Sequence, residues 1–235
     1  MNNSSMKYRH EYKYPVSDLE AAVLKERLKG IMISDPHSGS TGAYIISSLY
    51  FDDYYHSCYY ENENGTDPRE KFRIRIYNNS SDVINLECKR KEHSKTLKTS
   101  CRLSKEQVEN ILHSIPLKCD EETDPLLHKF IELQNTKGLK PKVIVEYKRM
   151  PFIYRAGNVR VTFDSHLVSS SYIEQFLNGD YPKRPIFPSG QLLLEVKFDE
   201  FLPDYLYDIM QLNNITQTAF SKYYLCRRFE LNSVR

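Results

Sequence analysis

A strict alternation of apolar and charged side chains constrains the fold of this chain more than any other feature of its sequence. In the segment KFRIRIY, residues 71–77, apolar side chains alternate with Arg73, Arg75 and Tyr77. Successive side chains of a β-strand point to opposite faces, so the segment predicts a strand with one apolar face and one basic face. A basic face of this kind must meet either water or a partner of opposite charge.

Similar segments recur along the chain, and they predict that β-sheet is its main element. The expected strands cover residues 8–14, 43–51, 71–77, 83–89, 96–103, 142–149, 158–164 and 192–198. Helical patterns are present at 18–28, 105–113 and 125–134, behind the candidate capping residues Ser17, Ser104 and Asp124, and again at 204–212 and 218–229. The 235 residues show no internal repeat and no long linker, which predicts a single domain over residues 1–235.

One face of the expected strands carries charged side chains with a positive bias. Counting by strand parity places ten basic and four acidic side chains on it: Arg9, Glu11, Lys13, Arg73, Arg75, Glu87, Lys89, Lys98, Arg102, Arg149, Arg160, Asp164, Glu195 and Lys197. Two arginines on alternate positions of a strand lie about 6.7 Å apart. They repel each other by roughly 2.5 kcal/mol at an effective dielectric constant of about 20.

The sign bias argues against an ordinary solvated sheet, because such surfaces usually mix charges of both signs. The net charge is only +2, yet residues 69–105 hold 11 Lys and Arg against 4 Asp and Glu, a local excess of +7. An anionic ligand at one site accounts for such a block. We therefore predict an α+β fold, a barrel with its basic faces turned inward as a tunnel and with helices packed on its apolar outside.

Carboxylates among the cations indicate a divalent metal ion. On the charged face of the expected strands, the pattern Glu-x-Lys occurs at Glu11, Glu87 and Glu195. Glutamate oxygen is a hard ligand, and Mg²⁺ or Mn²⁺ that bridges phosphate oxygens needs only one or two protein carboxylates. We interpret Glu195 as a metal ligand and Glu87 as an ion-pair partner of neighbouring cations.

Eight motifs in order resemble the VTC polyphosphate polymerase domain of the triphosphate tunnel metalloenzymes, the CYTH-like superfamily. The motifs are RHEYKY, SLYFDD, KFRIRIY, LECKRK, VEYKR, VRVTFD, LLEVKF and FSKYYL, and they extend over nearly the whole chain. The resemblance implies a closed eight-stranded antiparallel barrel that forms a tunnel, with helices packed on the outside and the final helix capping the tunnel. It also implies an ATP-binding transferase that passes the γ-phosphate of ATP to a growing polyphosphate chain with Mn²⁺ or Mg²⁺ and releases ADP.

The resemblance also assigns residues to this chemistry. Phosphate-holding and catalytic roles fall on Lys13, Arg73, Arg75, Lys89, Arg149, Arg160 and Lys197, substrate-binding roles on Lys98, Tyr147, Ser221 and Lys222, and the metal on Glu195. Arg9, Glu11 and Arg102 share the strand parity but receive no role. Arginine suits such a site because its planar fork stays charged and binds two phosphate oxygens at once.

Two other functions stay open at this point. A tunnel that admits water would be a metal-dependent inorganic or nucleoside triphosphatase, and a tunnel without turnover would be a polyphosphate- or nucleotide-binding module. Nucleic acid is not an expected partner, because most tyrosines fall on the apolar parity. The chain shows neither a signal region nor an apolar run of about 18 residues, so we expect a cytoplasmic protein, although fungal relatives sit in membrane complexes.

Overall fold

One curled antiparallel sheet organises the molecule, and its eight main strands follow the order β1-β10-β8-β7-β3-β4-β5-β6. The computed structural model describes residues 7–210 and 215–232. The strands are β1 (His10–Ser17), β3 (Tyr44–Asp52), β4 (Arg69–Tyr77), β5 (Ser80–Glu92), β6 (Lys95–Arg102), β7 (Lys140–Tyr154), β8 (Val159–Ser170) and β10 (Gln191–Phe198). Two short strands pair beside longer ones: β2 (Ile33–Ser34) pairs with β7, and β9 (Arg184–Pro185) pairs with β8.

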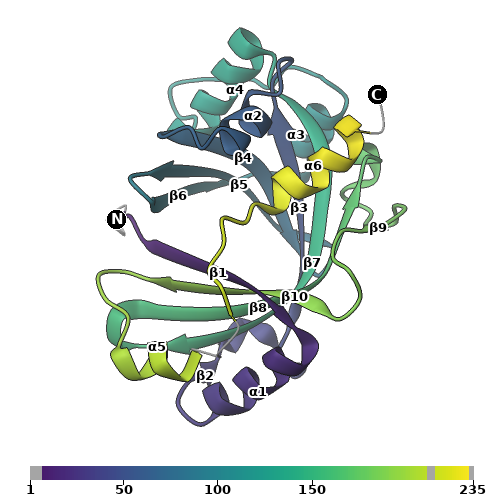
Figure 1. Cartoon of the computed structure of the whole chain (residues 1–235). Coiled ribbons are helices and arrows are strands. Elements are labelled where there is room, and N and C mark those ends of the chain that lie inside the picture. The colour runs from purple at the N-terminus through teal and green to yellow at the C-terminus, as the bar shows by residue number, and fades with distance from the viewer. Residues whose placement is uncertain (1–6, 211–214, 233–235) are drawn as a thin grey trace.

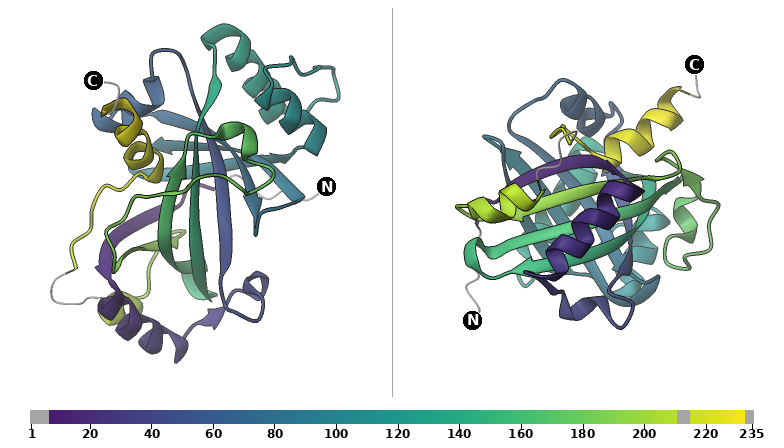
Figure 2. Two further views of the ribbon diagram at one scale, coloured as in Figure 1. Left: turned by 90° about the vertical axis from the view of Figure 1, so that its right-hand side faces the viewer. Right: turned by 60° about the horizontal axis from the view of Figure 1, so that its bottom comes forward.

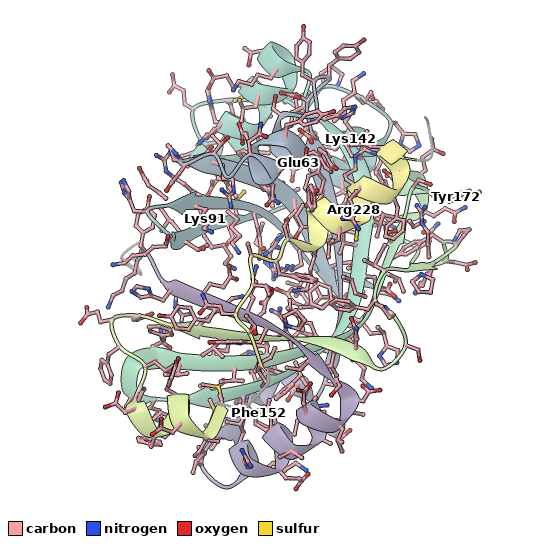
Figure 3. All side chains as sticks on the ribbon, in the orientation of Figure 1. Glu63, Lys91, Lys142, Phe152, Tyr172 and Arg228 are labelled. Atoms are coloured by element: carbon pink, nitrogen blue, oxygen red, sulfur yellow. The ribbon has the colours of Figure 1, made fainter. Side chains whose placement is uncertain are left out.

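Helices cover the outside of the curled sheet at two places (Figure 1). Helix α1 (Asp18–Lys29) and helix α5 (Asp204–Met210) pack on β1, β10 and β8, whereas α3 (Lys105–Leu112) and α4 (Pro125–Lys137) pack on β4, β5 and β6. Figure 2 shows α1 lying across the strands beneath it. Figure 3 places Phe152 near α1 and α5, and its side chain belongs to the buried apolar cluster beneath these two helices.

The apolar parity of the strands builds these two outer clusters. Ile74, Ile76 and Leu86 are fully buried beneath α3 and α4, and Val161 and Leu194 are fully buried beneath α1 and α5. Each side chain of this kind stabilises the fold by about 1.5–3 kcal/mol when it leaves water. The apolar faces therefore point outward against helices, and the charged faces line the concave side, as the sequence predicts.

The helix starts follow the capping residues found in the sequence. Ser17 and Ser104 each form a capping box, with Glu20 and Gln107 as the reciprocal partners. The carboxylate of Asp124 accepts the backbone N–H of Leu126 at the start of α4. Such caps satisfy backbone donors that the first helical turn leaves without partners.

The barrel is open along the seam between β1 and β6, which corrects the prediction of full closure. Within residues 7–210 and 215–232 the two edges are joined by a single bridge, in which the backbones of Arg9 and Thr96 exchange hydrogen bonds of 2.9 Å. Beyond it the segment before the last helix borders β1, because Thr218 donates its N–H to the Lys13 carbonyl at 2.9 Å. A segment that occupies the edge of β1 takes the place of pairing with β6.

Two helices differ from the sequence-based expectation. The last helix, α6 (Lys222–Asn232), starts later than residue 218, because 217–221 is not helical and the Ser221 hydroxyl accepts the N–H of Tyr224 as a cap. Helix α2 (Ser57–Glu63) was not predicted at all. The helix predicted at 204–212 was expected to end at residues 211–212, which lie outside the described residues. Within the described part, none of the helices is both long and apolar enough to cross a bilayer.

Candidate functional site in the concave face

Strand register gathers the predicted site residues on the concave face. Lys13 lies opposite Glu195, Lys197 opposite Arg160, Arg149 opposite Asp164, Arg73 opposite Glu87, and Lys89 opposite Lys98. Directly opposed side chains on one face of an antiparallel pair have Cβ atoms about 5 Å apart. The sheet therefore brings cations from seven strands to one surface, and α6 adds Lys222 to it.

Glu87 is the centre of one ion-pair group on this surface. Its carboxylate accepts the Arg73 guanidinium at 2.7 Å and the Lys98 ammonium at 3.1 Å, and Arg75 lies 3.5 Å away. Burial alone raises the pKa of Glu87, but Arg75, Arg73 and Lys98 together lower it well below its usual value. Glu87 thus stays charged and pairs with its neighbours, as interpreted from the sequence.

Glu195 and Asp164 form the centre of a second group. The Lys222 ammonium lies 2.7 Å from each of the two carboxylates, and the Arg149 guanidinium contacts Asp164 at 2.6 Å and Glu195 at 3.1 Å. Burial raises the pKa of Glu195, but Lys197 and the other cations lower it well below its usual value. The first residue of α6 is thereby tied to two strands of the sheet.

Glu11 joins this second group through lysines that it shares with Glu195. Lys197 lies 3.3 Å from Glu11 and 3.1 Å from Glu195, and Lys13 lies 3.5 Å and 4.0 Å from the same two carboxylates. Lys89 contacts Glu11 at 2.6 Å. The carboxylates of Glu11 and Glu195, on adjacent strands, are therefore close enough for one lysine ammonium to contact both.

The arrangement of Glu11 and Glu195 fits a divalent ion that also binds phosphate. The described residues contain no group of three or more His, Cys, Asp or Glu side chains that could hold a metal by themselves. Mg²⁺ and Mn²⁺ are commonly held by one or two carboxylates, with phosphate oxygens and water completing the shell. Glu11 and Glu195 supply such a pair of hard ligands, and the surrounding lysines are of the type that binds phosphate.

Other assigned residues reach this surface from its edges. Tyr147 accepts a weak hydrogen bond from Arg75 at 3.4 Å, and the Lys222 ammonium lies 4.7 Å from the centre of its ring. Burial raises the pKa of Tyr147, but Arg149 and Arg75 outweigh it and lower the pKa. Arg160 is placed apart from the two groups, because it contacts the Asp35 carboxylate of the loop before β3 at 2.5 Å.

Helix α6 covers the remaining part of the concave face. Tyr223 and Cys226 of α6 pack against Ile46, Val145 and the Tyr147 ring in a third apolar cluster. Figure 1 shows α6 crossing in front of β3 and β7, and Figure 3 shows Arg228 of α6 near Glu63 of α2. The C-terminal helix therefore caps the charged surface, as the resemblance implies.

Sequence reasoning gave Glu11 no role and overlooked Lys71. Both lie at positions i−2 from an assigned cation on the same strand, Lys13 and Arg73, so the alternation itself carried the signal. Asp35 was not foreseen, because it lies in a loop and meets Arg160 only through the fold. A separate hollow of about 560 Å³ near Cys119, Asp120 and His128 lies at α4, on the outside of the sheet.

Comparisons with known proteins identify the family and the fold of the chain. The model of a family described as the VTC domain matches residues 8–229 of the chain. No curated protein sequence matched significantly.

Among solved structures, HpAC1 from Hippeastrum, an adenylyl cyclase candidate described as having a dominant triphosphatase activity, has a similar fold. Its TM-score is 0.55 at 10% sequence identity, and the match covers 95% of this chain and 96% of that chain. An adenylate cyclase candidate from Bacillus halodurans matches with a TM-score of 0.49 at 16% identity, over 87% of each chain. The PH1819 protein from Pyrococcus horikoshii matches with a TM-score of 0.49 at 15% identity, over 95% of this chain and 99% of that one.

Proposed function

The chain belongs to the VTC domain family and has the triphosphate tunnel fold, and we propose that it is a polyphosphate polymerase that uses ATP. One observation carries the proposal: among the described residues, cations outnumber carboxylates on the concave face. The cations are Lys13, Lys71, Arg73, Arg75, Lys89, Lys98, Arg149, Arg160, Lys197 and Lys222, and the carboxylates are Glu11, Glu87, Asp164 and Glu195. An excess of this size on one surface favours a chain of phosphates as the ligand.

The proposed reaction transfers one phosphoryl group between two anionic chains. The bond between the γ-phosphorus of ATP and the β,γ-bridging oxygen breaks, and a terminal oxygen of polyphosphate forms the new bond to that phosphorus. ADP leaves with the electron pair of the broken bond. Catalysis then rests on holding the two oxygens in line and on neutralising charge, which positioned cations do without a covalent nucleophile.

Each group on the concave face has a part in this proposal. Arg73 and Arg75, set two residues apart, hold successive phosphates, and Lys222 brings α6 down onto them. Glu11 and Glu195 would hold a divalent ion, which supplies charge neutralisation at phosphate oxygens when bound. Lys13 and Lys197, which lie between these two carboxylates, would bind the phosphate oxygens next to it. The choice between Mn²⁺ and Mg²⁺ is left to experiment.

Product analysis tests the proposal directly. The protein is incubated with ATP and Mn²⁺, or ATP and Mg²⁺, and the products are separated on a gel that resolves phosphate chains by length. We expect a ladder of long chains together with ADP. ADP without chains, or no turnover of ATP, would contradict polymerase activity.

Hydrolysis is the second candidate function, and the open seam between β1 and β6 favours it. Among the described residues one bridge joins this seam, and an open seam would give water a route to the concave face. The activity described for HpAC1 is of the same kind, a triphosphatase. Orthophosphate released from triphosphate or ATP without chain growth would select this function.

The third alternative is a module that binds polyphosphate or a nucleotide without turnover. Triphosphate would then raise the melting temperature with no product at any metal concentration. A cytoplasmic location and a membrane-protein partner stay predictions that rest on the sequence alone, and nucleic acid is not a proposed partner.

A further inference from the structure

Lys71 lies on the concave face without an assigned role. It precedes Arg73 by two residues on β4, so the two side chains share one face, and it lies opposite Lys89 on β5. Its ammonium donates to the Asn62 side-chain oxygen of α2 at 2.9 Å and to the Ser221 hydroxyl at 3.3 Å. Lys71 thus joins β4, α2 and the start of α6.

Lys71 differs from the other cations of the concave face in its partners. The ammonium groups of Lys13, Lys89, Lys98, Lys197 and Lys222 each lie within 4.0 Å of a carboxylate. In the described part of the chain, no Asp or Glu oxygen lies that close to Lys71. Its two acceptors are neutral, and the Tyr223 ring lies 5.3 Å away.

A partly buried ammonium without a counter-charge is unfavourable. An ammonium has three N–H donors, and here Asn62 and Ser221 accept two of them. Burial lowers the pKa of Lys71 to about 7, and Arg69 and Lys13 act in the same direction. The charged and titratable groups around Lys71 are Arg69 of β4, Lys89 of β5, Lys13 of β1, Asp52 of β3, Cys58 and Glu61 of α2, and Tyr223 of α6.

We infer that Lys71 and Ser221 form a phosphate-binding subsite at the start of α6, which takes one phosphate group of the chain bound in the concave face. The inference rests on the proposed function for the class of ligand, a linear polyphosphate. It adds Lys71 to the binding residues, because the Lys71 ammonium has hydrogen-bond donors to offer and no carboxylate nearby to balance its charge.

Binding at this subsite exchanges one hydrogen bond for stronger ones. A phosphate oxygen replaces the Ser221 hydroxyl as acceptor of the Lys71 ammonium, and the free hydroxyl then donates to the same phosphate. Hydrogen bonds between ionised partners are roughly twice as strong as neutral ones. Because Ser221 also caps α6, a phosphate held there fixes the start of the helix that carries Lys222.

Calorimetry with inorganic triphosphate alone, without metal or ATP, tests the subsite. We expect Lys71→Met to weaken binding by about 10- to 100-fold, the loss of one or two hydrogen bonds to a charged group. Lys148→Met is the matched control, because Lys148 is also in a strand but is exposed on the outer face. Equal affinity of Lys71→Met and Lys148→Met would overturn the inference.

Proton uptake provides a second readout that a purely structural role of Lys71 would not change. Titration at pH 8 in two buffers of different ionisation enthalpy gives the number of protons bound with triphosphate. An amine with a pKa of about 7 is roughly one-tenth protonated at pH 8, so its pairing with phosphate takes up nearly one proton. We expect Lys71→Met and Lys71→Arg to take up about one proton fewer than the unmodified chain.

The arginine variant keeps the inference testable if the methionine variant does not fold. Lys71→Arg retains a charge, and its guanidinium is already protonated before phosphate binds. Proton uptake by this variant equal to that of the unmodified chain would overturn the inference. If the protein synthesises chains but Lys71→Met does not change triphosphate binding, the proposed polymerase stands and the subsite is wrong. If triphosphate binding depends on Lys71 but no chains are made, the subsite stands and the polymerase is wrong.

Discussion

Glu87 and Glu195 are both buried carboxylates surrounded by cations, but their surroundings differ. Glu87 is paired only with cations of the two strands that flank it, Arg73 and Arg75 on β4 and Lys98 on β6. Glu195 is contacted from three strands and from α6, and two further carboxylates share its cations. Glu87 therefore acts as a local counter-charge within the sheet. Glu195 lies where β1, β7, β10 and α6, which are far apart in the sequence, come together.

The difference separates a stabilising carboxylate from one suited to ligand binding. The ion pairs of Glu87 follow strand register and are formed without a ligand. At Glu195, Lys13 and Lys197 each divide their contacts between Glu195 and Glu11, so a metal with phosphate can replace lysine contacts there. The following predictions test this contrast, from the largest expected effect to the smallest.

Replacing Glu87 is expected to cost the most stability. Glu87→Gln leaves Arg73 and Arg75 buried without their counter-charge, and loss of one partner of a buried pair typically costs about 3–5 kcal/mol. Urea unfolding of the ligand-free protein measures the effect. The control is Glu70→Gln, since Glu70 pairs with Arg90 and Lys129 at a more exposed position and should cost less than about 1 kcal/mol. Equal losses in the two variants would contradict the role of Glu87.

Replacing Glu195 is expected to act on turnover. Glu195→Gln removes a proposed metal ligand, and we expect metal-dependent turnover of ATP or triphosphate to fall by about 10²–10³-fold, as for loss of a strong electrostatic contact in a transition state. Triphosphate binding without metal should stay nearly unchanged, because the variant keeps the surrounding cations. Glu200→Gln, on an exposed side chain, is the control. Turnover near the unmodified level would remove Glu195 from the proposed site.

Acid should destabilise the protein through both groups of carboxylates. In the folded chain the pKa values of Glu11, Glu87 and Glu195 lie well below the ordinary value of 4.5. Below pH 4.5 the unfolded chain therefore binds more protons than the folded one, and the free energy of unfolding falls as the pH drops. Denaturant unfolding from pH 6 to pH 2 measures this slope. A slope unchanged by Glu87→Gln would contradict the low pKa of Glu87.

Replacing Lys98 is expected to have the smallest effect. Its side chain is 51% exposed although it contacts Glu87 at 3.1 Å. Exposed ion pairs contribute about 0–1 kcal/mol, so Lys98→Met should lower the free energy of unfolding by less than about 1 kcal/mol. Lys95→Met on the same strand serves as the control. A loss comparable to that of Glu87→Gln would show that the group around Glu87 depends on all three cations.

Much of the fold could be predicted because alternation determines both strand position and the face of each side chain. The outward apolar faces and the inward cations follow from that pattern alone, as Ile74 beside Arg73 and Arg75 illustrates. The pattern fails where the backbone is irregular. In β8 the register to β7 shifts near His166, whose φ is 53°, so that Leu167 joins the concave apolar cluster.

Features that depend on distant contacts could not be read from the sequence. Closure of the barrel was an expectation from the family resemblance. In the structure an irregular segment lies along the edge of β1, where Thr218 pairs with Lys13. Helix α2 is held by Asp52, whose buried carboxylate accepts the N–H groups of Cys58 and Tyr59. Neither contact has a local signal in composition or periodicity.

The position of Lys222 has a consequence for how the protein is made. Translation produces α6 after every described strand. Strands β8 and β10 therefore leave the ribosome before Lys222, whose ammonium pairs with Asp164 and Glu195, has been synthesised. Until then these strands bring two acidic groups together with less positive charge around them. Nascent chains of this protein should therefore reach protease resistance only once the α6 sequence has emerged, and a chain arrested before residue 222 should remain digestible.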